Sequence, residues 1–544
     1  MNALLIVSAL ALAEPAPHAD HQHHLEQLGK VSFETSCSPQ AHAIFLRGVA
    51  LLHSFEYEPA ESAFNEAAAA DPSCAIAHWG AAMSNYHPLW APPSKPELDR
   101  GRAAVARAEA TPAKTGRERA YVAAISSFYR ESDRLDHKTR ALTYNAAMAG
   151  LYKAYPADHE AGIFYALSQI AAGTLDNDPE FSREKDAAVI LNAVLKEEPD
   201  HPGVAHYLIH NFDYPPLAEL AVPAAKRYAS IAPDSPHAQH MPSHIFTRLG
   251  MWEDSISSNL KSAEAARGLM KKKGFAGASR EELHAMDYLA YAYLQTGQNA
   301  KAQEVLTHLN SMQQVDEPIF SAAYAAMAVP ARIVLENRRW REAASLQVPD
   351  NVRKLVPFEN FRWAEAHVNF ARAVGAARSG DAALAREEAG KLRAIEDALV
   401  VPPGTYDWRK QVSIERQIAE AWAALAEGKK DEAISLMTAA ADLDDATEKH
   451  PVTPSAILPA REQLGEVLLE LRRPVEALAA YEASLKRAPR RLVGLYGAAR
   501  SAKLAGDATR AGRYFAELAD VTRASDGSRA EVREAREAAK LAVR

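Results

Sequence analysis

The sequence lacks any run of 18 or more consecutive apolar residues, so we expect no membrane-spanning helix in the mature chain. It also lacks the apolar–polar alternation of β-strands, whereas Ala, Leu, Glu, Lys and Arg, all good helix formers, are frequent. Neither sign of charge dominates: 62 basic and 70 acidic residues give a net charge of −8, without the basic stripe typical of nucleic-acid binders. The motifs GxxxxGK, GxGxxG, HExxH and GxSxG are absent too. These absences favour an all-helical protein that does not bind nucleic acid.

The N-terminus has the pattern of a secretory signal. Residues 4–13, LLIVSALALA, are apolar and end in Ala11-Leu12-Ala13, an A-x-A cleavage pattern. No Lys or Arg precedes this run, so the alternative is an apolar tail without a targeting role. We predict a signal peptide over residues 1–13, cleaved near Ala13, and a periplasmic or secreted protein. The polar stretch that follows, EPAPHADHQHH, predicts a flexible His-rich segment over residues 14–38.

Small and aromatic residues recur with a fixed spacing at both ends of the chain. Gly48, Ala60 and Phe64 have the same spacing as Gly465, Ala477 and Tyr481, and Ala511 and Phe515 follow 34 residues after the last two. Thirty-four residues is the period of the tetratricopeptide (TPR) repeat, a helix–turn–helix unit that stacks into a solenoid. We therefore predict an all-α, TPR-like superhelix with N-terminal repeats over 39–200, central repeats over 201–300, divergent repeats over 301–450 and C-terminal repeats over 451–544.

Only two cysteines occur, Cys37 and Cys74, and their separation of 37 residues is close to one repeat. Each precedes the first helix of its predicted repeat, and equivalent points on stacked hairpins are near neighbours. A disulfide between them fits an oxidising compartment. The alternative is two buried free thiols.

Two histidine pairs recur one repeat length apart in the central region. His206 and His210 are four residues apart in HPGVAHYLIHNFD, and His240 and His244 repeat that spacing 34 residues later in HAQHMPSHIF. Residues four apart share one face of a helix, so the four imidazoles should converge. Pro242 predicts that the helix restarts between His240 and His244, which shifts His237 and His240 relative to His244.

The candidate site comprises this histidine cluster and the polar residues of the same and the next repeats. The metal-ligand candidates are His206, His210, His237, His240 and His244; the binding candidates are Asp213, Arg248, His284, Tyr291 and Arg332; and Asp287 is a candidate ligand or general base. Imidazole and carboxylate donors suit a transition metal, with zinc or copper the first choices. Two other interpretations are open: a metal-free polar groove, and histidines that only pack.

The repeat frame resembles TPR proteins from about Pro39 to the C-terminus. The segments HPGVAHYLIHNFD, PHAQHMPSHIFTRLGMW and HAMDYLAYAYLQTGQ resemble, more narrowly, an uncharacterised family of exported bacterial TPR proteins. The resemblance implies a solenoid whose concave groove, lined by the first helix of each repeat, binds a peptide or protein partner. Three functions follow as hypotheses: a partner-binding groove that also holds a metal, a metal-dependent hydrolase or oxidase, and periplasmic copper or zinc handling.

Overall fold

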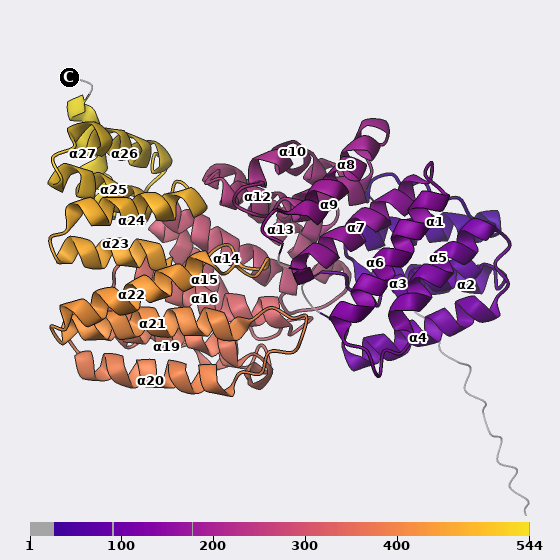
Figure 1. The fold of residues 1–544 in the computed structure, drawn as a ribbon, viewed down its shortest axis with the longest axis horizontal. Coiled ribbons are helices and arrows are strands. Elements are labelled where there is room, and N and C mark those ends of the chain that lie inside the picture. Colours follow the sequence, from indigo (N-terminus) through magenta and orange to yellow (C-terminus); the bar gives the residue numbers. More distant parts are fainter. Residues whose placement is uncertain (1–26, 90–91, 177, 543–544) are drawn as a thin grey trace, which may run out of the picture.

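The computed structural model describes residues 27–89, 92–176 and 178–542. The predicted signal peptide and residues 14–26 of the His-rich segment lie outside this range. The described chain is helical almost throughout, and its one extended pairing is an isolated bridge between Ala278 and Val315. Consecutive helices pack side by side in hairpins, and in the C-terminal half the helices from α19 to α25 are stacked one above another (Figure 1). The predicted all-α, TPR-like solenoid is confirmed.

The helices divide between two hydrophobic cores, one formed by residues 28–246 and the other by residues 252–535. The first contains α1 (Pro39–His53), α2 (Tyr57–Ala70), α3 (Ala75–Met83), α4 (Lys95–Ala110), α5 (Gly116–Tyr129), α6 (His137–Ala154), α7 (His159–Asp176), α8 (Ser182–Glu197), α9 (Pro202–Asn211), α10 (Val222–Ile231), α11 (Pro236–His240) and α12 (Pro242–Arg248). A 3-10 turn, η1 (Ala218–Ala221), precedes α10.

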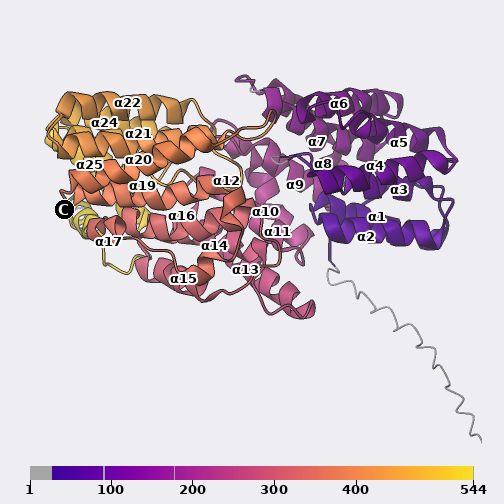
Figure 2. The ribbon, with the colours of Figure 1, turned by 90° about the horizontal axis from the view of Figure 1, so that it is seen from below.

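The second core is formed by the helices from α13 onward. It contains α13 (Trp252–Lys272), α14 (Arg280–Gln295), α15 (Asn299–Ser311), α16 (Phe320–Glu336), α17 (Trp340–Ala344), α18 (Asp350–Arg353), η2 (Phe358–Asn360), α19 (Arg362–Arg378), α20 (Ala382–Ala398), α21 (Trp408–Ala426), α22 (Lys430–Asp445), α23 (Ala460–Glu470), α24 (Pro474–Arg487), α25 (Leu492–Leu504), α26 (Ala508–Val521) and α27 (Ala530–Ala542). Helices α9 to α13 lie between the two ends in both views (Figures 1 and 2). None of the described helices is both long and apolar enough to cross a bilayer.

The repeated glycines explain how successive hairpins stack. A Cβ atom on Gly48 or Gly80 would come within 2.7 Å or 2.3 Å of the ring of Phe64, which is fully buried between the two helices. The same arrangement recurs near the C-terminus, where Tyr481 fills the space left by Gly465 and Gly497. One aromatic ring between two glycines therefore fixes the approach of neighbouring hairpins, because protein interiors leave no room for an extra methyl group.

The N-terminal segment differs from the prediction of a flexible region up to residue 38. Leu28 and Phe33 are buried, and the Lys30 amide donates a hydrogen bond to the Asp200 carbonyl. Cys37 and Cys74 form a disulfide with their Cα atoms 4.9 Å apart. Residues 28–38 therefore pack against the first core. Burial of their apolar side chains stabilises this ordered conformation, although the polar composition of the segment predicted flexibility.

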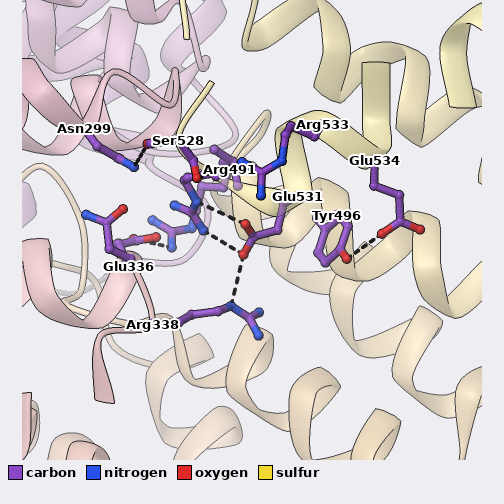
Figure 3. Close-up of polar contacts among 12 residues, drawn as sticks. Asn299, Glu336, Arg338, Arg491, Tyr496, Ser528, Glu531, Arg533 and Glu534 are labelled. Atoms are coloured by element: carbon purple, nitrogen blue, oxygen red, sulfur yellow. Dashed lines mark hydrogen bonds and ion pairs between the residues drawn. The ribbon is translucent and has the colours of Figure 1, made fainter. Parts of the chain in front are cut away.

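The C-terminal half curves until its end meets its beginning. Helix α25 contacts α14, and the buried Arg491 joins four helices: its guanidinium is 2.7 Å from Glu336 of α16, 3.0 Å from Glu462 of α23 and 2.8 Å from the Tyr291 hydroxyl of α14. Around it, Figure 3 shows the ion pair between Arg338 and Glu531 and the hydrogen bond from Asn299 to Ser528. The repeats of the second core thus close into one superhelical turn.

The segment between α22 and α23 covers the faces of α14 and α16 that the repeat frame assigns to an open groove. Its backbone carbonyls at Thr453 and Ser455 accept hydrogen bonds from Tyr288 and from Arg332. A peptide that used these faces would have to displace a segment of the same chain.

Candidate metal centre

Prolines begin the three short helices that carry most of the histidines. Pro202, Pro236 and Pro242 are the first residues of α9, α11 and α12, where a missing amide costs nothing. The predicted restart at Pro242 is therefore confirmed. Met241 between α11 and α12 keeps right-handed helical angles, with φ −51° and ψ −38°. Because the path hardly deviates there, His240 and His244 still share one face.

The six central histidines form two groups of three, which we call the first and the second triad. His206 and His210 of α9 and His237 of α11 make up the first triad, and His240 of α11, His244 of α12 and His284 of α14 make up the second. Within each triad the candidate nitrogen atoms all lie within 4.8 Å of one another. His284, which the sequence suggested only as a binding residue, thus joins the candidate ligands.

In the first triad the Nε2 atom of His206 is the meeting point. It lies 3.0 Å from Nε2 of His210 and 3.1 Å from Nε2 of His237. Its other nitrogen, Nδ1, donates to the backbone carbonyl of His53 across 2.6 Å. Because a carbonyl only accepts, the proton of a neutral His206 is on Nδ1, and Nε2 presents a lone pair to its two neighbours.

The second triad brings two lone pairs face to face. Nδ1 of His240 donates to the side-chain oxygen of Asn259, whose own amide group donates to the Ser255 carbonyl and so fixes that orientation. Nδ1 of His244 donates to the carboxylate of Asp213 across 2.9 Å. Both Nε2 atoms therefore lack a proton in the neutral rings, yet they lie 3.0 Å apart. Two lone pairs at this distance repel unless a cation lies between them.

Burial keeps these rings neutral. It lowers the pKa of His206, His210, His240 and His284 well below the ordinary value, and the neighbouring histidines lower it further. Burial also lowers the pKa of His244, although the hydrogen bond to Asp213 opposes this. Neutral imidazole is the form that binds transition metals.

Charged residues behind the second triad hold Asp213 in its ionised form. Arg248 donates to one carboxylate oxygen across 2.8 Å, and Lys449 lies 3.6 Å from the other. Burial raises the pKa of Asp213, but Lys449 and Arg248 outweigh it and hold this pKa well below the ordinary value. A carboxylate behind a histidine fixes the tautomer and the orientation of the ring, as in many metal sites.

A similar carboxylate stands behind the first triad. Glu281 lies 3.7 Å from Nδ1 of His237 and pairs with Arg280 across 2.9 Å. Burial raises the pKa of Glu281, and Arg280 and His237 outweigh it and lower that pKa. Each triad thus has a carboxylate beyond its ring of nitrogens, and neither carboxylate is one of the six candidate ligands.

A third group, His53, Glu160 and His201, is fully buried beside the first triad. The two carboxylate oxygens of Glu160 accept from Nε2 of His53 at 2.8 Å and from Nε2 of His201 at 3.1 Å. Nδ1 of His53 accepts from the Tyr207 hydroxyl. These contacts pair donors with acceptors and need no ion, although Nδ1 of His201 is buried without a hydrogen-bond partner. The His53 carbonyl orients His206.

Three residues predicted for the same site lie in a different one. Asp287 and Arg332 are buried together, with 3.4 Å between Nε and the carboxylate, and Arg332 also donates to the carbonyls of Ser455 and Ala456. Burial raises the pKa of Asp287, and Arg332 opposes this. Tyr291 accepts from Arg491. This polar cluster holds the segment between α22 and α23 and the C-terminal repeats, and it lies outside both triads.

The sequence pattern does not identify Asn259, Glu281 or the carbonyl of His53 as site residues. They come from α13, from the start of α14 and from the end of α1, and no fixed spacing relates them to the histidines. One signal for α14 was readable: His284 and Tyr288 are four residues apart, as are Asp287 and Tyr291, so the helix has two polar stripes instead of one. Tyr288 packs against His240 and His244, with ring centroids 4.8 Å and 5.2 Å away.

The comparisons with known proteins concern the fold alone. No protein-family profile matches the chain, and no curated protein matches it in sequence. A structure of the human IFIT1 dimer with m7Gppp-AAAA is similar over 83% of this chain and 90% of that one, with 12% identity and a TM-score of 0.36. Yeast Tom70 is similar over 93% of this chain and 95% of its own, with 12% identity and a TM-score of 0.31.

Proposed function

We propose that this protein binds two transition-metal ions, one in each histidine triad. The contact between His240 and His244 carries the proposal, because two unprotonated nitrogens 3.0 Å apart repel and a metal ion bound to both removes this repulsion. Two imidazole nitrogens bound about 2.1 Å from one ion at a tetrahedral angle are about 3.4 Å apart. The nitrogen spacings of both triads therefore suit ligands of a common ion.

The donors favour zinc or copper. All six candidate ligands are imidazoles, which suit both metals. A thiolate site is not expected, because Cys37 and Cys74 are joined to each other. That disulfide supports the proposal that the protein works in an oxidising compartment such as the periplasm or the cell exterior.

A second candidate function is metal-dependent catalysis, as a hydrolase or oxidase. Three protein ligands leave a coordination position for water or substrate, which is typical of catalytic sites, whereas structural zinc sites use four ligands. Asp287 is no longer a candidate base in this scheme, since it pairs with Arg332 outside the triads. Copper or zinc handling is the alternative in which the metal itself is delivered.

The proposal of a peptide or protein partner depends on the solenoid architecture alone. The faces of α14 and α16 contact the segment between α22 and α23, so a partner would bind another face or displace this segment. A partner-binding function predicts a ligand whose affinity is independent of metal.

Metal analysis of the purified mature protein tests the proposal. After loading with copper or zinc and dialysis, we expect about two ions per chain in the wild type and about one in His240→Ala. The control is His308→Ala, because His308 lies on α15 outside the triads, with 46% of its side chain exposed. This control should retain two ions. A wild type that holds no copper, zinc, nickel or iron would contradict the proposal.

A further inference from the structure

The two triads are direct neighbours. His210 of the first triad and His244 of the second have ring centroids 6.2 Å apart. His237 and His240 contribute one ligand to each triad from positions three apart on the same short helix, and residues with this spacing lie side by side. Two ions held by these ligands would be close enough for one small molecule to bind both.

On the side of the second triad the carboxylates are paired with cations. Asp213 and Glu448 are the carboxylates there, and Arg248, Lys449 and Arg487 are the cations. Arg248 bridges the two carboxylates, with 2.8 Å to Asp213 and 2.6 Å to Glu448. This side therefore offers no net negative charge to a bound ion.

On the side of the first triad carboxylates are in excess. Arg280 pairs with Glu281 at 2.9 Å and with Glu317 at 2.8 Å. The carboxylate of Glu56 is also close enough to Arg280 and His237 to interact with their charges. Asp316, which accepts a hydrogen bond from the Arg280 amide, is a fourth carboxylate near this one cation. Taken together, the carboxylates of the two sides outnumber the cations, and burial raises the pKa of two of these carboxylates, Glu56 and Glu317.

This balance distinguishes monovalent from divalent ions. Two monovalent ions bring less positive charge into this buried site than two divalent ions do. Burying uncompensated charge is energetically costly. Of the metals that imidazole binds well, copper is the one with a stable monovalent state in proteins, so the surroundings favour Cu(I).

We propose that the two triads hold a pair of copper ions and that the reduced pair binds dioxygen between the ions. The proposal rests on the metal binding proposed above. Each Cu(I) gives one electron to O₂, so that two Cu(II) ions and one bound peroxide (O₂²⁻) form, and no proton or further reductant is consumed. The total charge of the centre is the same before and after this step, so the surrounding carboxylates compensate both states equally.

The aromatic surroundings suit such a centre. The Tyr228 ring stacks on His206 with 5.0 Å between centroids, Phe55 stacks on His210 at 5.6 Å, and Tyr288 packs against both His240 and His244. These rings exclude water, which would otherwise protonate and release the peroxide. His237 has the most exposed side chain among the six ligands, 12%, and marks the side from which O₂ would enter.

Oxygen uptake by the copper-loaded protein tests this inference. The full mature chain is loaded with Cu(I) under anaerobic conditions, dialysed and exposed to O₂, while copper content, dissolved oxygen, near-ultraviolet absorption and electron paramagnetic resonance are measured. We expect two copper ions per chain and one O₂ consumed per pair. A new charge-transfer band should appear and should disappear under vacuum. The electron paramagnetic resonance signal should be weak, because the two Cu(II) spins couple.

Single-triad variants provide the comparison. His284→Ala and His210→Ala each disrupt one triad. Either variant should retain about one copper ion and lack the O₂ band. Once oxidised, it should give the electron paramagnetic resonance signal of an isolated Cu(II) ion at full intensity. His308→Ala should behave as the wild type. Two bound Cu(I) ions without O₂ uptake, two uncoupled Cu(II) signals, or a preference for zinc when both metals are offered would overturn the inference while metal binding stands. A protein that binds no metal would instead refute the function on which it rests.

Discussion

Asp213 accepts a hydrogen bond of 2.9 Å from Nδ1 of His244, and this bond directs Nε2 of His244 toward His240. The same carboxylate is held by Arg248 and lies 3.6 Å from Lys449. The orientation of one candidate ligand is therefore linked to the segment between α22 and α23, to which Lys449 belongs.

Replacing Asp213 should weaken the second triad selectively. In Asp213→Asn the neutral amide no longer stabilises the Nδ1–H tautomer of His244, so we expect the affinity of one of the two ions to fall 10- to 100-fold. The other ion should keep its affinity. Competition with a chelator measures both, and Asp200→Asn, at an exposed position, is the control. Equal weakening of both ions, or no change, would contradict the role given to Asp213.

Removing Arg491 should destabilise the second core. Arg491→Met leaves Glu336 and Glu462 buried without a cation, which costs about 3–5 kcal/mol in free energy of unfolding. The triple variant Arg491→Met/Glu336→Gln/Glu462→Gln should recover most of this loss, because the unpaired charges are gone. Denaturant unfolding measures both. Arg490→Met, whose ion pair with Asp520 is exposed, should change stability by less than about 1 kcal/mol. If Arg491→Met were as stable as the wild type, the stabilising role given to Arg491 would be refuted.

The disulfide should stabilise the first core without affecting metal binding. Cys37 and Cys74 close a loop of 37 residues, for which chain entropy gives about 3–4 kcal/mol. Cys37→Ala/Cys74→Ala should unfold at a correspondingly lower denaturant concentration and keep two ions. Reductant should destabilise the wild type to a similar extent and leave the variant unchanged. A wild type that is insensitive to reductant would show that the bond contributes nothing.

Glu160 should make stability depend on pH in the acid range. Burial raises its pKa, but His53 and His201 outweigh this and lower the pKa to about 2. Because the folded pKa lies below the unfolded value of about 4.5, the contribution is complete above pH 4.5 and is lost as the pH falls toward 2. Glu160→Gln should therefore be less stable than the wild type by about 3 kcal/mol at pH 6, and the difference should shrink as the pH approaches 2.

Unfolding measured at several pH values checks this difference. Glu58→Gln, at an exposed position on α2, serves as the control and should show no comparable pH-dependent difference from the wild type. A Glu160→Gln difference that stays constant from pH 6 to pH 2 would contradict the assignment.

The sequence predicted the repeats and the histidine pairs because both depend on spacing along one or two helices. Gly48 and Phe64 fix a hairpin locally, and His206 and His210 share a face wherever α9 lies. The restart at Pro242 was predictable for the same reason, since the missing amide acts within one turn.

Contacts that depend on the curvature of the solenoid were not predictable. Tyr291 and Arg491 are 200 residues apart and meet only because small rotations between repeats close the superhelix. The division of the histidines into two triads also depends on the exact packing of α9, α11, α12 and α14. Asp287 was grouped with the histidines because it lies in the next repeat, yet the packing of α14 against α16 turns Asp287 toward Arg332.

Crystallographic anomalous scattering from metal-loaded protein tests the central claim most directly. Data collected at the copper edge should show two anomalous peaks, one about 2 Å from Nε2 of His206 and the other about 2 Å from Nε2 of both His240 and His244. A map without a peak at either triad, or with copper bound only at surface histidines such as His308, would contradict it.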